Sequence, residues 1–407
     1  MAFNPLKEKG IPVEKQLKDW STLNVKPYDK NDVNPYTRCR IIIMNGAEVE
    51  GAFFSHQFAR HCDDIELKRT LAMARRVEQQ QQKRINWLIP ANESPLEVTI
   101  GYEQVAVDLT AALAQNEPDP VVKAALDFAL LEDFDHLYRY ADLLEMTQGI
   151  KAENIVGKMT EITVGRPTVS EHRHPFDEIR PNYSAEKADI LTKLHVMIIV
   201  AAEQQTMNFY MNVGNRAETD IGRGLYQEIG MVEEQHVTHY ESLADPTMSW
   251  FMRDVMHQYT ECYLYHSFMQ QEADDRIRKI WEEHLDMEIG QLKASCEMMK
   301  KHEKRDAAEF LPAAMPKPLI MESNIDYVRK IMAEQTDFNA KGTEYVPGEQ
   351  IPSDYRYFDH QKMVNGSWVP SQDIIRQYIE KNGKDYRLEI KGPHPVKRFQ
   401  KRDKVVK

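Results

Sequence analysis

"EDFDHLYRY", residues 132–140, has a counterpart 100 residues later in "VEEQHVTHY", residues 232–240. Both stretches contain an acid, a histidine three residues later and a tyrosine four residues after that: Asp133, His136 and Tyr140 in the first, Glu233, His236 and Tyr240 in the second. On an α-helix, positions three or four apart share one face. The two stretches therefore predict two equivalent helices, each with an acid and an imidazole on the same face.

A glutamate precedes each of these helices at the same distance. Glu103 in "GYEQVAVDL" lies 30 residues before Asp133, and Glu203 in "AAEQQTMNF" lies 30 residues before Glu233. The midpoint of each pair falls in a turn-like segment, "NEPDP" in the first case and "VGNRAETDIG" in the second. Residues equidistant from the turn of an antiparallel hairpin lie level with one another. We therefore expect each hairpin to hold its acid pair at the same depth.

Helix-forming residues dominate from about residue 45 to residue 304, with short breaks rich in Pro, Gly or Asn. Four helical hairpins are predicted, at residues 48–88, 96–146, 185–243 and about 247–301. The polar, proline-containing residues 147–184 predict a crossover between the second and third hairpins. Beyond residue 304, short helices are expected near residues 325–334 and 371–380, with an aromatic-rich loop at residues 345–368.

These patterns predict an all-α protein with three parts. Residues 1–44 form an N-terminal extension, residues 45–304 a helical domain, and residues 305–407 a C-terminal appendage that ends in a basic tail. Packing the second and third hairpins through their acidic faces would bury four carboxylates and two imidazoles in a core at residues 96–243. Such a cluster is prohibitively costly without compensation. Two divalent or trivalent cations, bridged by carboxylates, would supply it.

With a glutamate followed by an E-x-x-H-like motif on two successive hairpins, the chain resembles the ferritin-like superfamily of di-iron and di-manganese carboxylate proteins. The resemblance covers roughly residues 96–243 and is to rubrerythrin-like proteins, here without a rubredoxin domain. It implies a ferritin-like four-helix bundle with additional flanking helices. It also implies two metal ions, with iron preferred and manganese or a mixed pair as alternatives. The metal ligands that it implies are Glu103, Asp133, His136, Glu203, Glu233 and His236.

One ligand departs from the family pattern, because the first hairpin has D-x-x-H where E-x-x-H is usual. Aspartate is one methylene shorter than glutamate. Asp133 would then bind in a more monodentate way and leave a coordination position open, or Glu132 would replace it as the ligand. The register of the repeat favours Asp133.

The resemblance implies an oxidoreductase that activates dioxygen or hydrogen peroxide, with an external electron donor and a small organic substrate. A peroxidase-like or catalase-like scavenger is one alternative, and a non-catalytic metal-binding or storage protein is another. The extra hairpins and the aromatic C-terminal region favour an organic substrate, because a minimal scavenger would not need them. Tyr140 and Tyr240, one turn beyond the histidines, are candidate catalytic residues, with core packing as the alternative.

Other acidic and histidine residues are weaker candidates. A second, weaker repeat relates the outer hairpins and suggests an acidic site, although a solvated charged face explains the same residues more simply: Glu50, Glu78, Glu261 and Glu288. His195 lies eight residues before Glu203 on the same predicted face, with a buried structural histidine as the alternative. His172 and His174 have metal-like spacing, but in an irregular connector we expect them at the surface.

Composition excludes several classes of protein. The 407 residues are 42% hydrophobic and 29% charged, which is typical of a globular protein. A net charge of −12 argues against nucleic-acid binding, which needs clustered Lys and Arg. The four cysteines form no C-x-x-C pair, and we find no signal peptide or long apolar run. We therefore expect a cytoplasmic protein without membrane contact. We also expect a homo-oligomer, namely a dimer.

Overall fold

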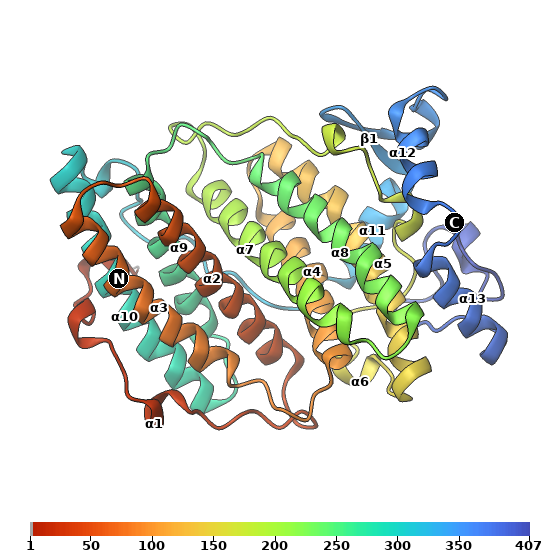
Figure 1. Cartoon of the computed structure of the whole chain (residues 1–407), viewed down its shortest axis with the longest axis horizontal. Coiled ribbons are helices and arrows are strands. Elements are labelled where there is room, and N and C mark those ends of the chain that lie inside the picture. Colours follow the sequence, from red (N-terminus) through yellow and green to blue (C-terminus); the bar gives the residue numbers. More distant parts are fainter. Residues whose placement is uncertain (1–2) are drawn as a thin grey trace. The chain divides into compact units, whose positions relative to one another are not determined.

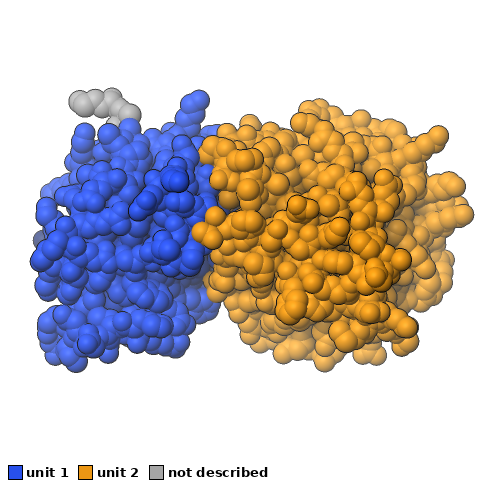
Figure 2. Space-filling view, turned by 90° about the horizontal axis from the view of Figure 1, so that it is seen from above, with its two compact units in different colours: residues 1–92, 183–202, 244–321 blue, residues 93–182, 203–243, 322–407 orange. Residues whose placement is uncertain are grey.

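The computed structural model describes residues 3–407 (Figure 1). Over these residues the chain forms thirteen α-helices and one two-stranded sheet, which confirms the predicted all-α class. The helices divide into two compact units (Figure 2). Unit 1 contains the residues up to 92, residues 183–202 and residues 244–321, and unit 2 contains residues 93–182, 203–243 and 322–407. This division differs from the predicted one, because residues 322–407 belong to the same unit as the second hairpin.

Unit 1 is built mainly from two helical hairpins (Figure 1). The first joins α2 (Pro35–Arg60) to α3 (Ile65–Asn86), and the second joins α9 (Trp250–Met269) to α10 (Asp275–Glu303). The short α1 (Trp20–Leu23) also belongs to this unit. Helix α7 (Ile190–Val213) contributes its first part to unit 1 and its second part to unit 2.

Unit 2 contains the helices that carry the predicted ligands. They are α4 (Pro95–Asn116), α5 (Pro120–Gln148), the second part of α7 and α8 (Asp220–Glu241). The connector between α5 and α7 includes the short α6 (Glu153–Val156). The C-terminal part adds α11 (Ile325–Gln335), an antiparallel hairpin of β1 (Phe338–Lys341) and β2 (Glu344–Pro347), α12 (Arg356–Asn365) and α13 (Pro370–Asn382).

Local sequence signals set the ends of the two helices that begin unit 2. Ser94 forms a capping box with Glu97 at the start of α4. The Asp119 carboxylate accepts hydrogen bonds from two backbone N–H groups in the first turn of α5, which starts with a proline. Gly149 ends α5 in the left-handed conformation, with φ of 67°. The "NEPDP" turn therefore lies where the sequence predicts it.

Two regions differ from the expected element bounds. Helix α2 begins at Pro35, inside the predicted extension, because the Asn34 side chain accepts a hydrogen bond from the Tyr36 N–H and caps it. The predicted aromatic loop at residues 345–368 contains most of β2 and all of α12. Regular structure in this region was not visible in the hydrophobic periodicity.

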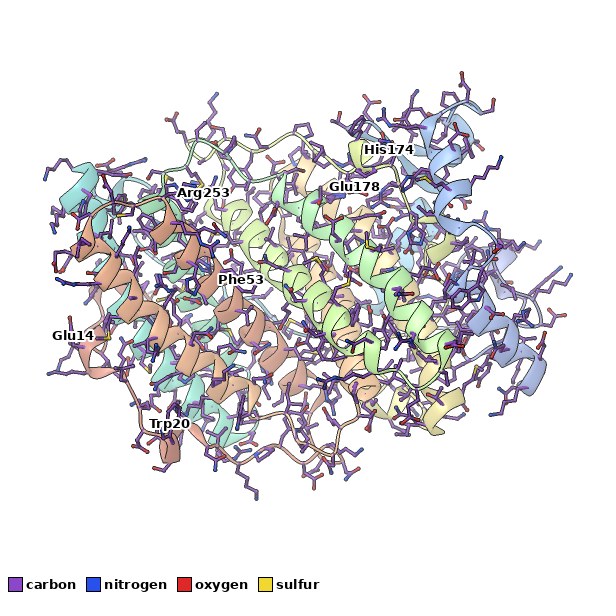
Figure 3. All side chains as sticks on the ribbon, in the orientation of Figure 1. Glu14, Trp20, Phe53, His174, Glu178 and Arg253 are labelled. Carbon is purple, nitrogen blue, oxygen red and sulfur yellow. The ribbon has the colours of Figure 1, made fainter. Side chains whose placement is uncertain are left out.

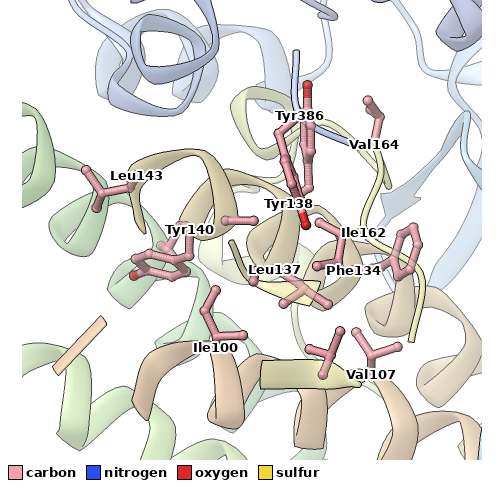
Figure 4. Packing of buried hydrophobic residues seen from close by; sticks show 14 of the residues in the cluster. Ile100, Val107, Phe134, Leu137, Tyr138, Tyr140, Leu143, Ile162, Val164 and Tyr386 are labelled. Carbon is pink, nitrogen blue, oxygen red and sulfur yellow. The ribbon is translucent and has the colours of Figure 1, made fainter. Parts of the chain in front are cut away.

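The apolar core of unit 2 joins the helical hairpin to the C-terminal residues. Figure 4 shows Ile100 and Val107 from α4 near Phe134 and Leu137 from α5, with Tyr386 from the C-terminal part beside Tyr138. The Tyr138 hydroxyl donates a hydrogen bond to Asp385 at 2.7 Å. Buried apolar area of this kind is the main favourable term in folding. The C-terminal residues are therefore part of the unit's core and not a loose appendage.

Large exposed apolar side chains are scattered over the surface. Trp20 and Phe53 are examples, with exposed fractions of 83% and 45% (Figure 3). None of the helices formed by residues 3–407 combines the length and the apolar character needed for a membrane span.

Candidate metal centre

The structure brings all six predicted ligands together inside unit 2, and each is at most 1% exposed. They come from four helices, with Glu103 on α4, Asp133 and His136 on α5, Glu203 on α7, and Glu233 and His236 on α8. The 30-residue spacing within each hairpin thus places a carboxylate of one helix level with a carboxylate of its neighbour.

The ligand atoms form two groups, and within each group the atoms lie within 4.8 Å of one another. One group consists of Asp133, Glu203, Glu233 and His236, and the other of Glu103, His136 and Glu233. Glu233 belongs to both groups, so its carboxylate is placed to bridge two ions. The His136 and His236 ring centroids are 6.0 Å apart. This arrangement fits a dinuclear centre with one imidazole for each ion.

Each histidine points its Nδ1 atom inward and is held from outside through Nε2. His136 Nδ1 lies 3.1 Å from Glu233 Oε1, while its Nε2 lies 2.8 Å from Glu171 Oε2. His236 Nδ1 lies 3.2 Å from Asp133 Oδ1, while its Nε2 lies 3.0 Å from Glu132 Oε2. A carboxylate on the outer nitrogen fixes the ring orientation and makes the inner nitrogen a better metal ligand.

Glu132 contacts groups on the outer side of the two ligand groups. Its Oε2 holds His236, and its Oε1 accepts a hydrogen bond from Arg166 at 2.9 Å and another from Arg173. Arg166, Arg173 and Glu132 are all buried. Because both oxygens of Glu132 are engaged away from the ligand groups, the geometry favours Asp133 as the ligand on α5.

Many oxygen atoms of the candidate ligands lack well-formed hydrogen bonds in the described part of the protein. Within residues 3–407, six buried oxygens of the four ligand carboxylates have no well-formed hydrogen bond: Glu103 Oε2, both oxygens of Asp133, both of Glu203, and Glu233 Oε2. Buried polar atoms are almost always paired, because an unpaired one costs about 1–3 kcal/mol. Six such atoms converging beside two imidazole nitrogens indicate a site for cations.

Burial and neighbouring charges shift the pKa values of the candidate ligands in different directions. Burial raises the pKa of Glu103 and of Glu203 well above their ordinary value, and nearby carboxylates add to the effect. Burial also opposes ionisation of Glu233, but hydrogen bonds and positive charge from His136 and His236 lower its pKa to about 2. Metal binding to these groups should therefore release protons.

The shorter side chain of Asp133 makes the two ligand groups unequal. Its carboxylate joins the group of His236 and not the group of His136. The His136 group therefore has three ligand residues where the His236 group has four. On this arrangement, the open position stays a prediction, and we expect it on the His136 side of the centre.

Three buried tyrosines surround the centre. The Tyr210 hydroxyl donates a hydrogen bond to Glu103 Oε1, an interaction that the sequence analysis missed. Tyr140 packs against the Tyr210 ring, with centroids 5.3 Å apart, and Tyr240 packs against His236 at 6.4 Å. Within the described chain, the hydroxyls of Tyr140 and Tyr240 have no hydrogen-bond partner. Both predicted tyrosines therefore line the site, one in each half of the repeat.

The connector at residues 147–184 supplies the outer carboxylate and both arginines. Asp135 on α5 anchors it, because one carboxylate oxygen accepts the Gly165 N–H at 3.0 Å and the other accepts both the N–H and the hydroxyl of Thr168. Gly165 fits closely here, since a Cβ at this residue would lie 2.2 Å from the Leu131 carbonyl oxygen. The predicted crossover is thus a buried structural part of the site.

The weaker histidine candidates lie apart from the two ligand groups. His172 is 7% exposed and lies 3.5 Å from Glu228, so the prediction that it lies at the surface was wrong. His174, in the same connector, is half-buried and stacks edge-on against Phe176 (Figure 3). His195 is buried in unit 1.

The weaker acidic candidates lie together in unit 1. Glu78, Glu261 and Glu288 are at most 2% exposed, so the prediction of a solvated charged face was wrong for them. Glu50 is partly exposed and contacts His257.

A pocket of about 380 Å³ is lined by Arg173, which contacts the outer side of the centre through Glu132. Arg173, Gln235 and Glu178 line its polar side, and Met231 and Trp368 line its apolar side. Arg173 also bonds Glu132, which holds His236, so a molecule in this pocket would be linked to the centre through two side chains. Burial raises the pKa of Glu178 to about 7.

Glu171→Gln should weaken metal binding on the His136 side by about 10- to 100-fold, because the amide replaces the carboxyl group that pairs with Nε2. The helices should remain, since Glu171 lies in the connector and not in α5. Competition with a chelator of known affinity measures the change. Glu186→Gln is the matched control, because Glu186 is exposed. Equal affinities in both variants would show that Glu171 does not support the imidazole.

Comparisons with protein-family models, with curated proteins and with solved structures found no match for this chain.

Proposed function

We propose that unit 2 is a ferritin-like di-metal carboxylate centre and that the protein is an oxidoreductase acting with dioxygen or hydrogen peroxide. The observation that carries the proposal is the convergence of buried carboxylate oxygens on two inward imidazole nitrogens, with six of these oxygens lacking a well-formed hydrogen bond among residues 3–407. Glu103, Asp133, His136, Glu203, Glu233 and His236 would hold two ions, with iron preferred over manganese. When bound, such an ion pair supplies redox equivalents to an oxidant.

The surrounding residues support this chemistry in three ways. Glu171 and Glu132 keep the histidines oriented through Nε2. Burial of every ligand excludes bulk water, so charge changes at the centre are felt strongly by nearby groups. The Tyr210 hydroxyl, bonded to Glu103, is placed to give or take a proton at that carboxylate.

The pocket at Arg173 favours an organic substrate over a simple scavenger. Its volume of about 380 Å³ is within the range of small-molecule sites, and it combines apolar walls with charged groups. An external electron donor would have to act as well, because residues 3–407 include no C-x-x-C pair for an iron–sulphur centre.

Anaerobic loading with Fe(II), followed by dioxygen or hydrogen peroxide, tests the proposal. The wild type should show a rapid absorbance change, and Asp133→Ala should abolish it because the His236 group loses a carboxylate. Glu218→Ala, at an exposed residue in the turn before α8, should react like the wild type. Reaction no faster than that of free Fe(II) would overturn the enzyme proposal. Accumulation of many iron atoms per chain would favour storage instead.

A further inference from the structure

Unit 1 repeats the hairpin pattern of the metal centre with a different set of side chains. Four glutamates that are at most 2% exposed face one another, which we call the acidic cluster: Glu48 on α2, Glu78 on α3, Glu261 on α9 and Glu288 on α10. Glu48 precedes Glu78 by 30 residues, the spacing found in the metal centre, and Glu261 precedes Glu288 by 27. Each hairpin of unit 1 thus contributes a pair of glutamates.

Glutamines stand where the metal centre has histidines. Gln81 follows Glu78 by three residues, and Gln291 follows Glu288 by three residues. Both amides reach the acidic cluster, because each donates a hydrogen bond to Glu288 Oε1, in the case of Gln291 at 3.0 Å. An amide group also carries a carbonyl oxygen that can bind a cation. Gln81 Oε1 accepts a hydrogen bond from the Gln291 amide at 2.9 Å, whereas Gln291 Oε1 has no well-formed hydrogen bond among residues 3–407.

A tyrosine completes the correspondence between the two units. In unit 2, Tyr210 donates to Glu103, the glutamate on the first helix of its hairpin. In unit 1, Tyr265 donates in the same way to Glu48. Tyr265 also lies 3.0 Å from His284 Nδ1. In both units, therefore, a buried tyrosine hydroxyl donates a hydrogen bond to a buried glutamate.

Unpaired oxygens of the acidic cluster point to a ligand. Among residues 3–407, the buried oxygens without a well-formed hydrogen bond include Glu48 Oε2, Glu78 Oε2, both oxygens of Glu261, Glu288 Oε2 and Gln291 Oε1. Two of them converge beside Gly51 on α2, where a Cβ would lie 3.4 Å from Glu261 Oε1 and 3.7 Å from Glu78 Oε2. Carboxylate oxygens from two different helices thus lie beside the same residue of α2.

There is space beside the acidic cluster and a route to it from the surface. A cavity of about 10 Å³, close to the smallest that holds a water molecule, is lined by Glu261 and His257. A pocket of about 260 Å³ is lined by Glu78 and Gln291 at its inner end and also by Arg69, whose side chain is exposed. A small cation could therefore reach the glutamates from solvent.

We infer that the acidic cluster binds a hard divalent cation, of the class of Mn²⁺, Mg²⁺ or Ca²⁺, through glutamate and glutamine oxygens. Carboxylate and carbonyl oxygens suit these ions, whereas imidazole suits iron and zinc. Replacing histidine by glutamine at both positions therefore changes the preferred metal while the helical frame is kept. This site is independent of the oxidation chemistry proposed for unit 2.

Binding of Mn²⁺ to the full-length chain tests the inference. Metal-free protein is equilibrated with Mn²⁺, and bound metal per chain is measured by elemental analysis, with free Mn²⁺ followed by its electron paramagnetic resonance signal. Glu261→Gln with Glu288→Gln should lose at least one Mn²⁺ per chain, both in the wild type and in a His136→Ala, His236→Ala background that weakens unit 2. Glu282→Gln, on α10 but exposed, should keep that ion. Unchanged Mn²⁺ content in the glutamate variants would overturn the inference.

A second variant keeps the test decisive if loss of the glutamates prevents folding. Gln81→His with Gln291→His retains every carboxylate and restores the histidine spacing of the metal centre. In competition between Zn²⁺ and Mn²⁺, the ratio of bound Zn²⁺ to bound Mn²⁺ should rise relative to the wild type. The same ratio in both proteins would show that the glutamines do not contact a cation, and would also overturn the inference.

Discussion

Replacing either histidine of the metal centre by alanine should remove most of the metal bound at that position without unfolding the chain. His136→Ala leaves Glu103 and Glu233 in its ligand group, whereas His236→Ala leaves three carboxylates in the other. We therefore expect the larger loss of metal in His136→Ala. Elemental analysis gives the metal per chain, and far-UV circular dichroism reports the helicity that should remain.

His56→Ala is the control for this pair, because His56 lies on the exposed face of α2 in the other unit. It should bind as much metal as the wild type. An unchanged metal content per chain in both histidine variants would show that the histidines are not metal ligands. A larger loss in His236→Ala would contradict the inequality that we attribute to the short side chain of Asp133.

The convergence of the six candidate ligands could be predicted because metal binding ties residue type to helical spacing. A three-residue step from Asp133 to His136 fixes one face of α5, and the 30-residue step from Glu103 fixes the facing position on α4. The same spacing recurs at Glu203, Glu233 and His236. A solvent-exposed charged helix face would not require such a repeat. The hairpins themselves followed from turn residues such as those at Asp119 and Pro120, where capping groups are local in sequence.

The residues that orient the histidines could not be predicted in the same way. Glu171, Arg166 and Arg173 lie in an irregular connector, where no period relates a residue to its neighbours in space. Their positions depend on the docking of the connector on Asp135, which is a tertiary interaction. Glu132 carried a local signal, since it directly precedes Asp133, but its role became clear only from its arginine partners.

The acidic cluster shows how a small error in register hides the residues that come together. The weak repeat between the outer hairpins pointed to Glu50, whereas the 30-residue spacing from Glu78 points to Glu48. Two residues along a helix turn a side chain by about 200°, nearly to the opposite face. Glu48 is accordingly buried among the other glutamates, while Glu50 is partly exposed and contacts His257.

Gly165→Ala should lower the stability of the protein by at least ~3 kcal/mol, because the new methyl group meets backbone and cannot be relieved by a rotamer change. Its Cβ would lie 2.2 Å from the Leu131 carbonyl oxygen and 2.8 Å from the Asp135 nitrogen. The connector must then move away from α5 and lose its hydrogen bonds to the Asp135 carboxylate. The urea midpoint of the metal-free protein measures the loss.

The same movement should weaken metal binding, since Arg166, Glu171 and Arg173 follow Gly165 in the connector and hold the outer side of the centre. Gly230→Ala on α8 is the matched control, because the nearest atom to its Cβ would be 3.5 Å away, which is ordinary contact. Alanine favours a helix over glycine by about 1 kcal/mol, so Gly230→Ala should be as stable as the wild type or more stable. If Gly165→Ala instead unfolds at the wild-type midpoint and binds metal equally well, the connector does not position the groups that orient the histidines.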